Sequence, residues 1–244
     1  MSFAKGITWR QPAVFAATTL VCTVLAIWAV VAAPVGSFAG VSGLYIAAAV
    51  YVPLALWFGV WGCFAGYLSC IFTGLYLGYS VPFVMVWALA DFFEGFVPLV
   101  IYRSIKTKPT LQLNHPKMTY GLNTLLALDL VGSGAALALS YSAVFIATFV
   151  VGIALLAVQA SVEDRKTWVT WLIVGVFLAS LVSGLFGVGA LVAFGNVPQS
   201  AFLSVFGGWV FGDIIVLATL GTILTVVLTP VIMKSRVYVR RVFS

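Results

Sequence analysis

Four acidic residues, Asp91, Glu94, Asp129 and Asp213, lie inside long apolar stretches of this 244-residue chain, which has six Asp and Glu residues in total. None of the twelve Lys and Arg residues lies in such a stretch. A carboxylate in the middle of a bilayer costs about 2.5–3.5 kcal/mol, so it is rare there and usually has a function. Without a basic partner it must stay protonated, accept hydrogen bonds or bind a cation.

Two of these acids follow a tryptophan by four residues, as Trp87–Asp91 and Trp209–Asp213. In a helix this spacing places the ring one turn from the carboxyl group on the same face. A tryptophan ring beside a carboxylate suits an organic cation through cation–π attraction. Glu94 follows Asp91 by three residues and shares its face. The sequence therefore predicts a ligand-binding site formed by Asp91, Glu94, Trp87, Asp213 and Trp209, with Asp129 as a further candidate.

A structural role is the alternative for these residues. An aspartate in a crossing rich in glycine and proline can cap a helix break, and a tryptophan near a membrane surface can be an interfacial anchor. The cysteines, Cys22, Cys63 and Cys70, show no CxxC spacing and are interpreted as packing residues. His115 is the only histidine. We predict no metal site and no cofactor.

The composition predicts an integral membrane protein, because 63% of the residues are hydrophobic and 7% are charged, against about 25% charged residues in soluble domains. The basic residues gather near Arg10, Arg103, Arg165 and Lys234, at the ends of apolar segments. This distribution is typical of the positive-inside rule and not of a nucleic-acid surface. We predict a multi-pass protein of the cell membrane with both termini cytoplasmic and no nucleic-acid partner.

The predicted fold is an all-α bundle of eight transmembrane helices in one domain, residues 1–244. A crossing needs about 20 residues, so the two longest apolar runs must each fold back, one near Gly59 and Gly62 and the other near Ser140–Ser142. Eight crossings put all four basic clusters on one side, whereas the uncharged turn near Gly59 leaves a six-crossing arrangement with a re-entrant piece as the alternative. The predicted crossings are 13–33, two within 40–79, 82–103, two within 120–159, 168–193 and 203–233.

The fourth and eighth crossings share the order Gly, Val-Pro, Trp, Asp and then a further proline. This order suggests two parallel four-helix repeats, 12–103 and 120–233, as in transporters that arose by duplication.

The stretch from Tyr51 to Arg103, with Phe58-Gly-Val-Trp-Gly62 and Trp87-Ala-Leu-Ala-Asp91, resembles the substrate-binding S components of energy-coupling-factor vitamin transporters. The small residues Ala13 and Ala17 resemble the helix through which such proteins dock their coupling subunit. The resemblance implies a subunit that binds a vitamin-like or cationic small molecule beside a separate coupling subunit and ATPases.

The stretch Gly207-Gly-Trp-Val-Phe-Gly-Asp213, followed by Leu228-Thr-Pro230, instead resembles the end of MASE1-type membrane sensor domains. That resemblance implies a stand-alone sensor of a small ligand.

We expect no enzymatic activity, because the sequence contains no phosphate-binding Gly-x4-Gly-Lys motif and no recognisable catalytic dyad. The first functional hypothesis is therefore a substrate-binding or translocation subunit of a membrane transporter. The alternatives are the sensor module and an accessory subunit of a larger membrane complex, with membrane lipid as the surrounding partner in each case.

Overall fold

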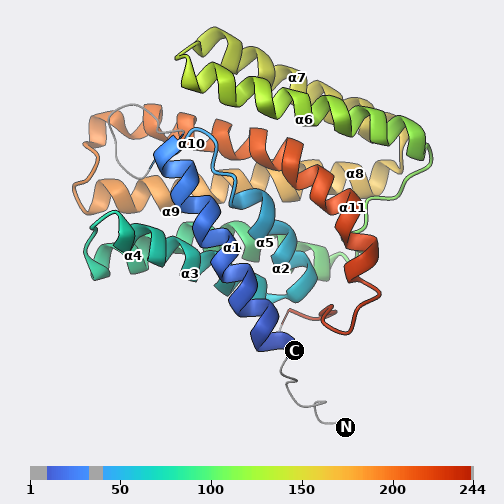
Figure 1. Cartoon of the computed structure of the whole chain (residues 1–244), viewed down its shortest axis with the longest axis horizontal. Coiled ribbons are helices and arrows are strands. Elements are labelled where there is room, and N and C mark those ends of the chain that lie inside the picture. The colour runs from blue at the N-terminus through green and yellow to red at the C-terminus, as the bar shows by residue number, and fades with distance from the viewer. Residues whose placement is uncertain (1–9, 33–40, 243–244) are drawn as a thin grey trace.

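The computed structural model describes residues 10–32 and 41–242, and these residues form helices joined by short connections (Figure 1). Lys5 and the predicted outer loop near Pro34 lie outside the described residues. Six apolar helical segments are long enough to cross a membrane. The prediction of an all-α, multi-pass membrane bundle is therefore confirmed.

The segments follow the predicted crossings closely, and several of them are built from two or more consecutive helical elements. In chain order the elements are α1 (Arg10–Ala32), α2 (Ala48–Phe58), α3 (Val60–Tyr76), α4 (Val81–Trp87), α5 (Leu89–Ser104), α6 (Pro116–Ala138), α7 (Ser142–Val162), α8 (Arg165–Thr170), the π-helix η1 (Trp171–Leu178), α9 (Ala179–Ala193), the 3₁₀-helix η2 (Gln199–Ala201), α10 (Phe202–Val216), the π-helix η3 (Leu217–Gly221) and α11 (Thr222–Ile232).

Both predicted reversals occur where the sequence placed them. Gly59 separates α2 from α3 with φ +64°, a left-handed conformation that glycine adopts without strain. Ser140, with φ +58°, lies in the turn between α6 and α7. The resulting α6–α7 hairpin lies along one side of the bundle (Figure 1).

The first apolar run departs from the prediction of two full-length crossings. At 1.5 Å per residue, the 11 residues of α2 extend about 17 Å and the 17 residues of α3 about 26 Å, against about 30 Å of hydrocarbon. The chain before α2, residues 41–47, is mostly non-helical and almost entirely buried. Irregular backbone is tolerated at membrane depth where protein surrounds it. The second predicted crossing is thus a short helix, α2, preceded by the buried irregular residues 41–47.

Close backbone approach holds the irregular part of this segment in place. Gly212 of α10 lies so near the backbone of Gly43 that no Cβ would fit between them. The Ser42 hydroxyl donates to the carbonyl of Ala29 in α1 at 3.0 Å. Residues 41–47 are therefore packed from two sides, by α1 and α10.

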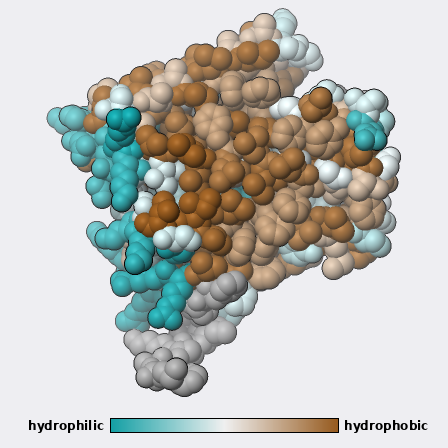
Figure 2. Space-filling view, turned by 180° about the vertical axis from the view of Figure 1, so that it is seen from behind, coloured by the Kyte–Doolittle hydropathy of each residue, from teal (hydrophilic) through white to brown (hydrophobic). Residues whose placement is uncertain are grey.

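The uncharged turn at Gly59 lies at the basic end of the bundle. Arg103 Nη2 at the end of α5 donates to the carbonyls of Leu56 and Val239, at 2.8 and 2.7 Å. The Val239 N–H in turn donates to the Trp57 carbonyl at 2.9 Å. Hydrophilic residues gather along one edge of the molecule, beside a broad hydrophobic surface (Figure 2). The turn is thus on the same side as Arg103, as a count of eight segments requires.

Candidate functional site

Three of the four predicted acids meet in the interior of the bundle. Asp91 and Glu94 come from α5 and Asp213 from α10, and their exposed fractions are 1%, 0% and 0%. The three carboxyl groups are near enough to interact electrostatically with one another. Asp91 and Asp213 lie near the middle of the apolar segments Val81–Ser104 and Gln199–Ile232. This acid cluster, Asp91 with Glu94 and Asp213, is therefore at mid-depth.

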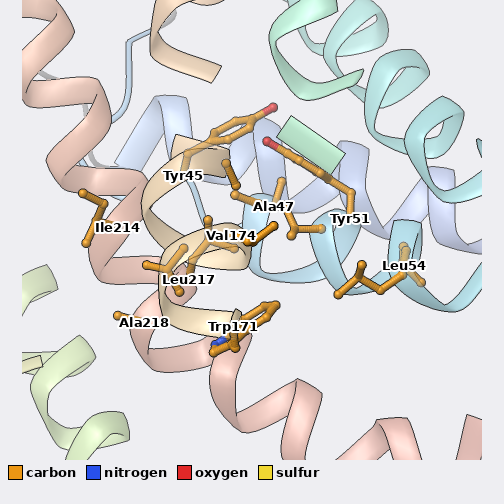
Figure 3. Close-up of a cluster of buried hydrophobic side chains, with 14 of the residues drawn as sticks. Tyr45, Ala47, Tyr51, Leu54, Trp171, Val174, Ile214, Leu217 and Ala218 are labelled. Atoms are coloured by element: carbon orange, nitrogen blue, oxygen red, sulfur yellow. The ribbon is translucent and has the colours of Figure 1, made fainter. Parts of the chain in front are cut away.

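Two tyrosines, one in the irregular residues 41–47 and one in α2, donate hydrogen bonds to the acid cluster. Tyr45, just before α2, donates to Asp91 Oδ2 at 2.9 Å, and Tyr51 of α2 donates to Glu94 Oε2. Both rings lie at one edge of a buried apolar cluster, with their hydroxyl groups on the same side and Trp171 at the opposite edge (Figure 3). Neither tyrosine could be predicted from the sequence, because nothing in an apolar run marks them as partners of acids that lie more than forty residues away.

Asp213 has the least satisfied side chain of the three. Neither of its oxygens has a hydrogen-bond partner of good geometry, and Glu94 Oε1 also lacks one. Ser183 of α9 lies beside both Glu94 and Asp213, and its hydroxyl accepts the indole N–H of Trp209 at 3.0 Å. The site therefore contains buried acceptor oxygens without a well-formed hydrogen bond, with the Ser183 hydroxyl and the Trp209 indole as the donors near Asp213, which is a costly arrangement in an apolar interior.

The two predicted tryptophans contact each other beside this cluster of acids. The rings of Trp87 and Trp209 meet edge to face, with centroids 6.3 Å apart and an interplanar angle of 84°. Gly187 leaves room for Trp209, since a Cβ there would be 2.6 Å from the indole ring. One face of Trp87 stacks on Phe83 at 5.6 Å. The juxtaposition expected from the Trp-x3-Asp pattern is present, although the Trp87 face is already partly covered.

The structural alternative of helix capping does not occur in the described structure. Asp91 lies in the first turn of α5, three residues after its N-cap residue Ala88. The hydrogen bonds to Asp91 and Glu94 come from tyrosine side chains and not from backbone N–H groups. Among the residues that the structure describes, no basic side chain contributes to the electrostatic surroundings of the acid cluster.

Asp129 lies apart from the other acids. It belongs to α6, its side chain is 8% exposed, and Oδ2 has no hydrogen-bond partner. Its closest neighbour of note is Gly152 of α7, where a Cβ would be 2.9 Å from Oδ2. The structure thus places Asp129 between the helices of the hairpin and does not join it to the acid cluster.

Two π-helical segments flank the site. η3 begins four residues after Asp213, and η1 ends five residues before Ser183. The Trp171 indole of η1 donates to the Thr222 hydroxyl, next to η3, at 2.8 Å. Such segments are rare and often mark functional sites.

Within residues 10–32 and 41–242, no group of three His, Cys, Asp or Glu side chains could hold a metal ion. Cys22, Cys63 and Cys70 are all buried and free, as expected for packing residues. Cys70 lies next to Asp91 and adds a weak polar neighbour to the site.

No protein-family model, curated protein or solved structure matches this chain.

Proposed function

We propose that this multi-pass membrane protein is a substrate-binding or translocation subunit of a small-molecule transporter, without catalytic activity of its own. The observation that carries the proposal is the convergence of Asp91, Glu94 and Asp213 at mid-depth with no basic partner. Transporters commonly bind their substrates near the bilayer midplane beside interrupted helices. Here the acid cluster is contacted by Tyr45 and Tyr51, which come from the buried irregular residues 41–47 and from the short helix α2 that follows them.

The chemistry of the acid cluster favours a cationic ligand. Three carboxylates at this depth cannot all be charged without a counter-charge, because each costs about 2.5–3.5 kcal/mol on insertion scales. Glu94 and Asp213 together present three oxygen atoms without a well-formed hydrogen bond, although Ser183 lies beside both residues. An ammonium group offers donors to these oxygens and the charge that stabilises their ionised form. Anionic or purely apolar ligands supply neither.

Ligand entry requires a rearrangement of the interior. The acid cluster is fully enclosed, and Tyr51 occupies Glu94 Oε2. A cation that approaches Glu94 must compete with this tyrosine. Movement of the short helix α2 is the simplest route, because the irregular residues 41–47 before it provide a hinge.

Energy for transport would come from separate subunits. The sequence has no Gly-x4-Gly-Lys motif for ATP binding. Ala13 and Ala17 both lie on an exposed part of α1, where small residues allow another helix to approach closely. We include in the proposal that this surface docks a coupling subunit.

Mass spectrometry of small molecules that copurify with the protein, followed by thermal unfolding with primary-amine and quaternary-ammonium probes, tests the proposal. We expect an organic cation to copurify and to raise the unfolding temperature. Glu94→Gln should abolish this protection, whereas Asp129→Asn should keep it, because Asp129 is a buried acid outside the acid cluster. Equal protection of both variants, or no protection by any cation, would contradict the proposal.

The identity of the partners separates the alternatives. Copurification of ATPases and a coupling subunit supports the transporter, and a signalling kinase supports the sensor. A large stable assembly with neither ATPase nor bound cation supports the accessory subunit.

A further inference from the structure

A second candidate site lies at the basic end of the bundle, away from the acid cluster. A cleft of about 400 Å³ opens between the end of α5, the residues that follow it and the chain after α11. Its lining includes Arg103, Lys106, Thr107, Lys108, Tyr238 and Arg240. We refer to it as the basic cleft.

The charges of the basic cleft are not neutralised by the described part of the chain. Four basic side chains line it and no acidic one does. The two acids outside the apolar stretches have other partners. Glu163 accepts hydrogen bonds from Asn114, His115 and Thr119, and Asp164 accepts one from Thr167 at the start of α8. The cleft therefore holds an excess of positive charge that favours an anion.

Two buried donors that line the cleft lack acceptors. Thr107 is only 8% exposed, and its hydroxyl has no partner. Arg103 uses Nη2 for two backbone carbonyls, but its buried Nε has no partner. The positive-inside rule accounts for basic residues at this end of the molecule, but it does not account for unpaired donors beside them. An anionic oxygen atom in the cleft would satisfy them.

The backbone at Lys106 is a further indication of a ligand. Helix α5 ends at Ser104 with Ile105 as its C-cap, and Lys106 follows at φ +52°. The Lys106 N–H donates to Arg103 O, and the Thr107 N–H donates to Tyr102 O. This is the Schellman arrangement, in which the residue at positive φ is usually glycine. Lysine adds strain at this position and gains no structural hydrogen bond from its side chain. Its side chain does line the cleft.

We propose that the basic cleft binds the phosphate-bearing headgroup of an anionic phospholipid. A lipid is favoured over a soluble phosphate because the cleft adjoins the ends of the apolar segments that finish at Ser104 and Ile232. Ile105 and Val231, beside it in the chain, are 48% and 66% exposed and can contact acyl chains. Basic pockets at the cytoplasmic ends of transmembrane helices bind such headgroups in this way. The site is independent of the proposed cation pocket.

The test uses purified full-length protein in a neutral detergent, with short-chain phosphatidylglycerol, phosphatidylcholine and inorganic phosphate as separate probes. Native mass spectrometry measures retention of each probe, and thermal unfolding measures protection. We expect phosphatidylglycerol to be retained and to protect, and the other two to have little effect. Equal protection by inorganic phosphate would overturn the lipid assignment, and equal behaviour of both lipids would overturn the site.

Lys106→Gly provides the decisive variant, because it removes the charge and also relieves the backbone strain. Its fold should therefore be kept or stabilised without lipid, while its affinity for phosphatidylglycerol falls about fivefold, as expected for the loss of one basic contact. Lys166→Gln is the matched control, since Lys166 is exposed and does not line the cleft. Unchanged lipid affinity in Lys106→Gly, or an equal loss in Lys166→Gln, would refute the proposal.

Discussion

We expect the substitution Asp213→Asn to stabilise the protein and at the same time to weaken its binding of organic cations. Asp213 is fully buried, and neither carboxyl oxygen has a well-formed hydrogen bond, although Ser183 and Trp209 lie nearby. Charge at this depth costs about 2.5–3.5 kcal/mol on insertion scales, and we use that value as the favourable contribution to the stabilisation. The new amide must itself be desolvated, at about 1–3 kcal/mol, unless it donates to a neighbour. Glu94 Oε1 is an unpaired acceptor nearby.

The balance of these terms is a gain of about 1–2 kcal/mol in the free energy of unfolding. For a chain of this size each kcal/mol changes the unfolding temperature by about 2–4 °C, so the variant should unfold about 2–8 °C higher. Loss of one hydrogen bond to a charged group costs a cation about 1.5–3 kcal/mol, or roughly a tenfold to hundredfold loss of affinity. Stability and binding should therefore change in opposite directions.

Thermal unfolding in detergent, followed by tryptophan fluorescence with and without a quaternary-ammonium probe, measures both quantities on one sample. Asp129→Asn is the control, because it removes an acid at similar depth outside the acid cluster and should leave the probe-induced shift unchanged. A lower unfolding temperature for Asp213→Asn together with an intact probe-induced shift would refute the reasoning. Asp213 would then be a structural residue.

Three further substitutions test the packing and electrostatics. Tyr51→Phe removes the donor to Glu94 and should lower the free energy of unfolding by about 1–3 kcal/mol. The control Tyr67→Phe loses an exposed hydrogen bond to Met85 and should cost less than about 1 kcal/mol. Equal losses in denaturant titrations would argue against the buried pair. Gly212→Ala introduces a Cβ into the backbone of Gly43 and should destabilise by about 1–3 kcal/mol, while Gly207→Ala, with open space around it, should be neutral or stabilising in the same thermal assay. Burial tends to raise the pKa of Glu163, but hydrogen bonds from Thr119, His115 and Asn114 outweigh it and lower that pKa below its usual value. The resulting stability is present above the unfolded pKa of about 4.3 and is lost as the pH falls through the lower folded value. Glu163→Gln should therefore flatten the decline in unfolding temperature below about pH 5. An unchanged decline would contradict this expectation.

The sequence was sufficient for the helices but not for every crossing. Apolar length and the turn residues Gly59 and Ser140 placed both reversals correctly. Hydropathy could not show that residues 41–47 are irregular and that α2 is short, because these residues are as apolar as a helix would be. Their conformation depends on tertiary contacts such as the close approach of Gly43 and Gly212, which local sequence does not encode.

The site could be predicted in part for a similar reason. Buried acids are conspicuous in an apolar chain, so Asp91, Glu94 and Asp213 were found from their residue type alone. The repeated spacing from tryptophan to aspartate also indicated that Trp87 and Trp209 share the site. Tyrosine, in contrast, is common in membrane helices, and only the folded structure shows that Tyr51 donates to Glu94. Asp129 had the same signal as the others, and only its position in the α6–α7 hairpin separates it from them.

Helix α2 connects the two ends of this arrangement. Near its start, Tyr51 donates to Glu94, and near its end, the Leu56 carbonyl accepts a hydrogen bond from Arg103. Both partners belong to α5, so α2 is attached to one rigid helix at two points. Pro53 lies between these points and removes a backbone hydrogen bond that would resist bending. If a cation displaces Tyr51 from Glu94, the attachment at Arg103 remains, because it lies at the basic end. The part of α2 that precedes Pro53 must then swing away from α5 about this fixed end. The irregular residues 41–47 before α2 would change conformation to allow such a movement.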